Sequence, residues 1–201
     1  MAEQKTLRLV LPPDQLSAFF PLLQQGIWLH ARIGCSVTEL LTGQFGIAEQ
    51  YLVERITTLF VDGKAIDDPQ TCYVNDRSTL ALSSAMPGLV GATMRRGGHL
   101  AAMRGAITYR EQHQARSAAG RIRIKLFNMV MAELGALLLG YGICLSRREF
   151  ERFMDENNDR FRRSSETVTP GGRLIDPAGP LKNIRPAEAN DEILLKVAFQ
   201  S

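Results

Sequence analysis

The sequence predicts an α+β protein made of two diverged copies of one strand-and-helix unit, joined by a basic connector. Apolar residues alternate at strand spacing in some short runs and recur at helical spacing in others, and the order of these runs occurs twice along the 201 residues. We expect residues 1–86 to form the first unit, residues 87–119 the connector and residues 120–201 the second unit. In each unit a mixed sheet would pack against a helix, with an extra helix after the first strand.

The first half begins with a strand, a helix and a second strand. Residues 6–11 alternate between leucine and other residues, which is the period of a half-buried strand. A helix is expected over residues 14–24, because proline is tolerated in a first turn and Asp14 suits the N-terminal dipole. The apolar, partly alternating run at residues 27–33 predicts the next strand.

A second helix and three short strands complete the first half. Ser36 followed by Glu39 is a capping-box pattern, so a helix should begin there. Residues 56–61 are rich in β-branched and aromatic residues, and the Asp62-Gly63 pair after them predicts a hairpin turn. The last strand is expected at residues 79–83.

The second half repeats this order, which is the most informative feature of the sequence. Its expected elements are a strand at 121–126, a helix at 129–139, a strand at 143–145, a helix capped by Ser146 and a last strand at 191–197. The run Gly172-Arg173-Leu174-Ile175-Asp176 echoes Gly63-Lys64-Ala65-Ile66-Asp67 at the corresponding place. We interpret the two halves as an internal duplication.

The first half resembles a ubiquitin-like β-grasp domain over residues 34–84. The resemblance rests on the strand at 56–61, the Gly63-Lys64 turn, the Ile66-Asp67 pair and the Ser78-Thr79-Leu80 opening of the last strand. It implies a duplicated fold of a kind that binds other proteins. The sequence departs from the family at the helix of residues 14–24, where the family has a hairpin turn, and no di-glycine tail directly follows the last strand.

The cysteine content and the hydropathy of the sequence indicate the cellular compartment of the protein. The three cysteines form no CxxC pair, and an odd number cannot close as a disulfide framework, so we expect a reducing compartment. The longest apolar stretch, residues 130–145, contains Glu133 and is too short to span a bilayer. No secretory signal pattern opens the sequence. These features predict a soluble cytoplasmic protein that does not bind membranes.

The connector contains a cationic segment. Between residues 88 and 125 there are eight arginine and lysine residues and one acidic residue, Glu111. Such a segment could bind nucleic acid or another polyanion through phosphate contacts; alternatively it is solvated or pairs with acids such as Asp67 and Asp68. The candidate polyanion-binding residues are Arg95, Arg96, Arg104 and Arg110.

A second motif in the connector is a candidate processing site. Arg95-Arg96-Gly97-Gly98 resembles the basic-basic-Gly-Gly ending that ubiquitin and bacterial sulfur carriers use for C-terminal activation. Cleavage after Gly98 would turn the first half into a carrier with a flexible tail. The alternative is a connector that contains two adjacent glycines.

Catalytic and metal-binding patterns are not recognisable in the sequence. His30, His99 and His113 show no metal-ligand spacing with the cysteines or with one another. Cys35 precedes a helix start, where the dipole could lower a thiol pKa, although a buried structural cysteine is the alternative. We therefore expect no catalytic residue, no metal and no cofactor.

The leading hypothesis from the sequence is a non-enzymatic interaction or scaffold protein. Its units would offer sheet faces and edges to a protein partner or to another copy of the chain. The carrier precursor and the polyanion-binding module are the alternatives.

Overall fold

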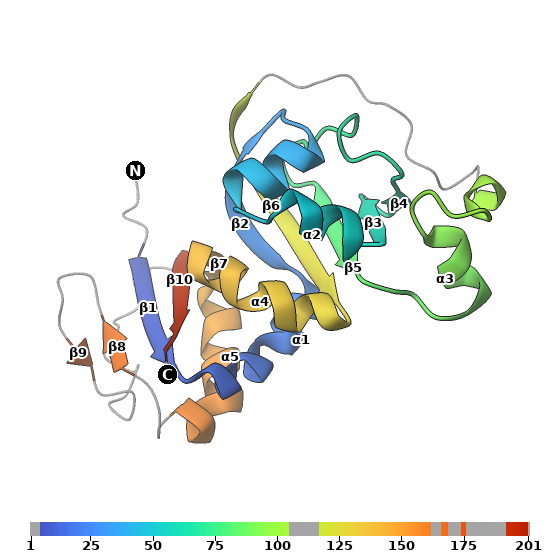
Figure 1. The fold of residues 1–201 in the computed structure, drawn as a ribbon. Coiled ribbons are helices and arrows are strands. Elements are labelled where there is room, and N and C mark those ends of the chain that lie inside the picture. The colour runs from blue at the N-terminus through green and yellow to red at the C-terminus, as the bar shows by residue number, and fades with distance from the viewer. Residues whose placement is uncertain (1–4, 105–116, 162–165, 169–173, 176–191, 201) are drawn as a thin grey trace. The chain divides into compact units, whose positions relative to one another are not determined.

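A computed structural model of the chain describes residues 5–104, 117–161, 166–168, 174–175 and 192–200. The fold is α+β, as predicted, and separates into two compact units that each contain a mixed sheet. One, the terminal unit, combines residues 1–20 with residues 136–201, and the other, the central unit, comprises residues 21–135. Figure 1 shows the elements of both.

Most of the predicted strands and helices are present. The central unit contains β2 (Ile27–Ile33), η2 (Glu39–Gln44), α2 (Glu49–Glu54), β3 (Thr58–Val61), β4 (Lys64–Ala65), β5 (Thr79–Ser83), α3 (Gly88–Met94), η3 (Ala101–Arg104) and β6 (Ala118–Phe127). The terminal unit contains β1 (Lys5–Leu11), η1 (Pro13–Phe19), β7 (Ile143–Ser146), α5 (Arg147–Phe161), β8 (Glu166–Val168), β9 (Leu174–Ile175) and β10 (Glu192–Phe199). Helices α1 (Phe20–Gln25) and α4 (Met129–Tyr141) cross the boundaries between the units.

The strands of the central unit lie in the order β4-β3-β5-β6-β2. β6 is parallel to β5, with Thr79 opposite Arg123, and antiparallel to β2, with Ile27 opposite Ile124. The remaining neighbours, β3 with β5 and β3 with β4, are antiparallel. β6 therefore joins β2 to the rest of this sheet, as Figure 1 shows in yellow.

The core of the central unit follows from alternation along its strands. Ile122, Ile124 and Leu126 of β6 are 0% exposed, whereas the residues between them are half-buried. The buried side chains Leu40 and Leu52 come from the helical segments that lead from β2 to β3. This arrangement buries the apolar side chains of the strands beneath helices, which lets a small unit keep a core.

Local sequence signals predicted the turns and caps of the central unit correctly. Asp62 and Gly63 have φ values of 50° and 78°, which the two central residues of a type I′ hairpin turn require. The capping box is closed, because Ser36 Oγ accepts from the Glu39 amide at 3.1 Å and Glu39 Oε2 accepts from the Ser36 amide at 2.9 Å. The helix that follows is a π-helix over Glu39–Gln44, and α2 was not predicted.

The strands of the terminal unit lie in the order β7-β10-β1-β8-β9. β1 and β10 are parallel, with Leu9 opposite Val197, so the first and last described strands of the chain are neighbours. β10 is antiparallel to β7, and β1 is antiparallel to β8. As in the central unit, one parallel pair has an antiparallel strand on either side.

An aromatic cluster forms part of the core of the terminal unit. The ring of Phe19 lies with its centroid 4.8 Å from that of Phe153, 5.9 Å from that of Phe161 and 6.2 Å from that of Phe199. Aromatic pairs at such distances add to the stabilisation from buried area. The segment expected to form an extra helix thus packs Phe19 of η1 against α5 and β10.

The division into units differs from the predicted ranges 1–86, 87–119 and 120–201. β6, expected to open the second unit, pairs with β2 and β5 of the central unit, and β1, expected to open the first, pairs with β8 and β10 of the terminal unit. The reason is that both strands alternate alike, so their patterns do not specify which sheet accepts them. Part of the predicted connector, α3 and η3, belongs to the central unit.

Two helical segments bear on the expected connector and on the long apolar stretch. Of the connector, η3 covers Ala101–Arg104, and residues 105–116 lie outside the described part. Among the described residues, no helix has the length and apolar character needed to cross a membrane. The apolar helix α4 instead buries Val130 and Leu138 completely.

Insertion of a protease recognition sequence between Arg104 and Ser117 tests the contribution of β6. After cleavage the two fragments should co-elute in size-exclusion chromatography, because β6 buries Ile122, Ile124 and Leu126 against the other fragment. Burial of each contributes about 1.5–3 kcal/mol, so losing all three would cost roughly 5–9 kcal/mol, comparable with the total stability of a domain. Ile124→Asp should weaken this association, and Lys125→Asp, which changes the opposite face of the same strand, should not. Because β1 also pairs with β8 and β10 across the cut, urea denaturation of the uncut chain is the deciding measurement. Equal stability of the Ile124→Asp and Lys125→Asp variants would contradict the assigned role of β6.

Candidate functional site

Residues 84–104, here called the glycine-arginine arm, contain most of the residues singled out in the sequence. The arm leaves the end of β5 and carries α3 and η3, which Figure 1 shows in green beyond β3 and β4. It is attached to the central unit at its start, where Thr57 Oγ1 donates to the Ser84 carbonyl at 2.7 Å. Asn128 Nδ2, just after β6, donates to Ser83 Oγ at 3.0 Å and to the Ala85 carbonyl.

Asp67 fixes the far part of the arm. Its carboxylate forms an ion pair with Arg104, which is 3% exposed, and also accepts a hydrogen bond from the Gly97 amide at 3.2 Å. The predicted pairing of the cationic segment with Asp67 is therefore confirmed for Arg104. Because a buried guanidinium needs a partner to offset its desolvation, this arginine serves the fold.

Arg96 fixes the middle of the arm against α2. Its backbone amide donates to the Thr57 carbonyl at 2.8 Å, and its Nη2 donates to the Leu52 carbonyl at 3.0 Å, near the end of that helix. A basic side chain at the last carbonyls of a helix is a favourable arrangement. Burial lowers the pKa of Arg96, an effect that the nearby carboxylates of Asp67 and Asp68 oppose.

A hollow of about 800 Å³ lies between the arm and the start of β3. Its lining consists of Thr57, Thr58, Ser84, Ala85, Met86, Gly88, Gly91, Ala92, Arg95, Arg96, Gly97, Gly98, His99 and Leu100. The titratable side chains among these residues, two arginines and a histidine, are all of the basic type. The hollow is therefore both glycine-lined and biased towards hydrogen-bond donors and positive charge.

Two buried polar atoms of residues in this lining have no hydrogen-bond partner. Thr58 is 1% exposed, and its Oγ1 meets no donor or acceptor. Nη1 of Arg96 is also buried without a partner. A buried polar group in this state is costly, so its presence at a concave surface is a reason to look for a ligand. Sequence reasoning missed Thr58, because a threonine in a β-rich run carries no signal of its own.

The glycines of the candidate processing site are folded into the arm. Gly97 has φ of +58°, and the Gly98 amide donates to the Arg95 carbonyl at 3.2 Å. The Gly98 carbonyl in turn accepts from the Ala101 amide at 2.9 Å. In this state the Gly97-Gly98 pair forms a hydrogen-bonded turn at the hollow.

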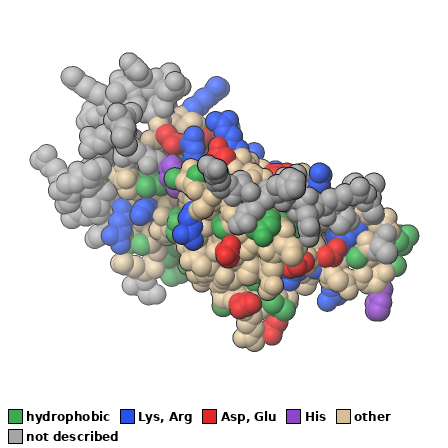
Figure 2. All heavy atoms as spheres, turned by 90° about the horizontal axis from the view of Figure 1, so that it is seen from above, with side chains coloured by type: hydrophobic (Ala, Val, Ile, Leu, Met, Phe, Trp, Pro, Cys, Tyr) green, Lys and Arg blue, Asp and Glu red, His purple; other side chains and the backbone are tan. Residues whose placement is uncertain are grey.

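The candidate polyanion-binding residues have different environments. Arg95 is exposed, Arg96 is half-buried, Arg104 is buried on Asp67, and Arg110 lies outside the described residues. Figure 2 shows basic and acidic side chains close together on the face in view. The arm thus offers one freely exposed arginine among the three that are described.

Burial rather than a helix dipole determines the state of Cys35. Desolvation is the largest effect and raises the pKa of this thiol, the Glu39 carboxylate raises it further, and hydrogen bonds lower it by less. This direction is opposite to the lowered pKa considered for this helix start and fits the alternative, a buried structural cysteine. All three cysteines are buried, and none of them forms a disulfide.

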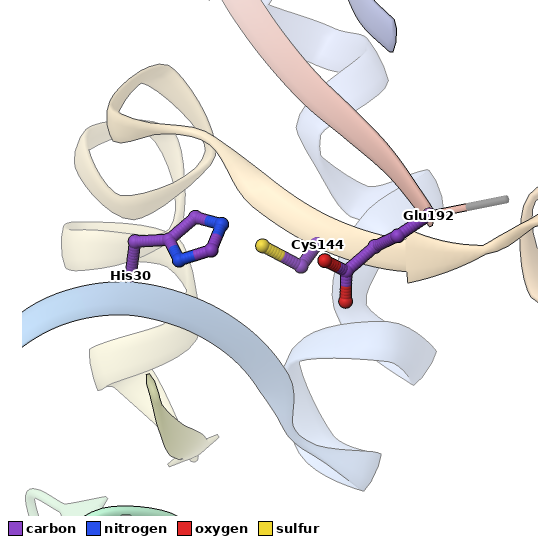
Figure 3. A group of neighbouring side chains, drawn as sticks. All are labelled: His30, Cys144 and Glu192. Carbon is purple, nitrogen blue, oxygen red and sulfur yellow. The ribbon is translucent and has the colours of Figure 1, made fainter. Parts of the chain in front are cut away.

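Other side chains of metal-ligating types belong to different units. Cys144 on β7 and Glu192 at the start of β10 come from neighbouring strands of the terminal unit, as Figure 3 shows. His30 is an exposed residue of β2 in the central unit, and His113 lies outside the described residues. A zinc site takes at least three protein ligands, so we assign no metal to the pair in the terminal unit.

Comparison of the chain with family models, with curated proteins and with solved structures found no match. Any assignment of class therefore rests on the geometry described above.

Substitution of the two threonines at the hollow should have opposite effects on stability. Thr58→Val removes an unpartnered buried hydroxyl with little change of shape, and should raise the free energy of unfolding by about 1 kcal/mol. Thr57→Val removes the donor to the Ser84 carbonyl and should lower it by about 1 kcal/mol. Urea denaturation of both variants measures the difference, and a destabilised Thr58→Val would mean that its hydroxyl has a partner.

Proposed function

We propose that the chain is a non-enzymatic protein-interaction protein built from two ubiquitin-like units. The strand order of the central unit supports this proposal. A parallel pair, β5 and β6, has β3 and β4 on one side and β2 on the other, and helical segments connect β2 to β3. This is the arrangement of a β-grasp sheet in which β6 takes the place of the first strand.

The repeated capping box supports a duplication. Ser146 Oγ accepts from the Glu149 amide at 3.3 Å, and Glu149 Oε2 accepts from the Ser146 amide at 2.9 Å, as Ser36 and Glu39 do at the corresponding place. Ser36 lies three residues after the end of β2, and Ser146 is the last residue of β7. In the first half β2 is followed by the helical segments η2 and α2 and by three strands, and in the second half β7 is followed by the helix α5 and by three strands. On this proposal the two halves have exchanged their first strands, β1 and β6.

The single observation that carries the interaction role is an apolar surface on the arm. Leu89 and Val90 of α3 are 71% and 62% exposed, and Met103 of η3 is 71% exposed. Several large apolar side chains exposed on one short segment are a candidate docking site. These three residues, here called the apolar ridge, lie on one segment that is fixed by Arg96 and Asp67.

Charge favours a partner of complementary chemistry over a second copy of the chain. Arg95 and His99 are exposed on the same arm. Two copies meeting through this surface would bring like charges together, which disfavours association. We propose that the ridge binds a protein segment whose apolar side chains are flanked by acidic ones.

Substitution of the ridge tests the interaction role. Leu89→Ser with Val90→Ser should weaken binding of a purified partner by at least about tenfold in calorimetry, because truncating buried anchor side chains costs more than 1 kcal/mol each. Met129→Ser, which changes a 60% exposed apolar residue of the central unit outside the arm, is the matched control. Partners are first recovered from lysate of the native host and then purified and titrated. Partner binding unaffected by the ridge variant, or self-association through the ridge in sedimentation, would contradict the proposal.

The intact mass of the protein from its own host decides whether it is a carrier precursor. A fragment ending at Gly98 would lack β6, and with it three fully buried side chains of its own sheet. We therefore expect that the chain is not cleaved after Gly98, so that no fragment ending there is detected. Detection of a fragment ending at Gly98 would establish processing and contradict this expectation.

A further inference from the structure

We propose that the hollow beside the arm binds one small oxyanion group, a carboxylate or a phosphate, carried by a ligand with an apolar part. This site goes beyond the proposed interaction role and does not depend on it. Its donors are Thr58 and Arg96, one from β3 and one from the arm.

Thr58 gives the first reason. Its side chain is almost completely buried, it lines the hollow, and its hydroxyl has no partner. Valine has nearly the same shape and would fill this position without a buried hydroxyl. A hydroxyl at this place is therefore best explained by a ligand group that enters the hollow and accepts a hydrogen bond from it.

Arg96 gives the second reason. Its guanidinium is held in place, because Nη2 donates to the Leu52 carbonyl at 3.0 Å and the backbone amide is fixed on Thr57. With one end of the guanidinium occupied, Nη1 remains buried and without a partner. Fixed donors of this kind bind an oxyanion strongly, because little side-chain freedom is lost on binding.

The remaining lining determines the class of ligand. A volume of about 800 Å³ is within the range of small-molecule sites and exceeds what an inorganic ion needs. Met86 and Leu100 supply apolar surface, and the exposed Arg95 adds positive charge. A cation is disfavoured, since no carboxylate belongs to the lining and Asp67 already accepts from Arg104 and Gly97.

The same observations favour a single anion over a polyanion. Nucleic acid binding needs several cations free to contact successive phosphates. Within the described part of the arm, Arg104 is buried in its ion pair with Asp67 and Arg96 points one of its nitrogens at the Leu52 carbonyl. The arm therefore suits one anionic group in a defined place.

Titration of the full chain with glutarate and with inorganic phosphate, followed by amide resonances in NMR, tests the site. We expect saturable shifts at Thr58, Arg96 and Gly98 with millimolar affinity for at least one probe. Tighter binding of glutarate would identify a carboxylate ligand, and tighter binding of phosphate a phosphorylated one. Either outcome therefore identifies which of the two oxyanion groups, carboxylate or phosphate, the natural ligand carries.

Variants separate specific binding from general charge. Thr58→Val and Arg96→Gln should each weaken binding about tenfold or more, because each removes a hydrogen bond to a charged group. Arg32→Gln, which removes an exposed arginine of β2 that does not line the hollow, should bind as the natural protein does. Should Arg96→Gln release the arm, Thr58→Val still decides, since it leaves every assigned contact of the arm intact. Shifts that do not saturate, or that are equal in Thr58→Val, would overturn the proposal.

Discussion

The parallel pairing of β5 with β6 is the constraint on which the central unit depends. Parallel neighbours cannot be joined by a tight turn, so the chain must run back along the sheet before β6 begins. This return lies between β5 and β6 in the sequence, and the arm is its first part. What looks in the sequence like a connector between two domains is thus the crossover within one unit. Its attachments to Thr57, Leu52 and Asp67 follow from that position.

The fixed arm explains why the arginines are not equivalent. Asp67 accepts from Arg104 and Gly97, and the Leu52 carbonyl accepts from Arg96, so two of the three described arginines hold the crossover in place. The hollow lies beside the fixed arm, and two of the residues that line it, Thr58 and Arg96, each have a buried polar atom without a partner. The apolar ridge is exposed by the same arrangement. Both proposals, a protein-binding ridge and an oxyanion site, therefore derive from one structural feature.

Local signals predicted most elements and little of the site. Alternation located the strands at residues 27–33 and 79–83, and the Asp62-Gly63 pair specified its hairpin, because each depends on neighbouring residues only. The helix α2 was missed, since its six residues give too short a pattern. The arginines and glycines of the arm were singled out, but which of them would be buried depended on Asp67, about 30 residues earlier in the chain.

The sequence by itself determined the α+β class, the order of most strands and helices, the caps at Ser36 and Ser146 and the basic character of the arm. Only the tertiary structure decided which strands share a sheet. β1 and β6 carry the same alternation, and a side-chain period of two describes the buried face of a strand but not its neighbours. The partners of a strand are selected by long-range packing, and so the hollow, which lies between a strand and a crossover, became visible only in the folded chain.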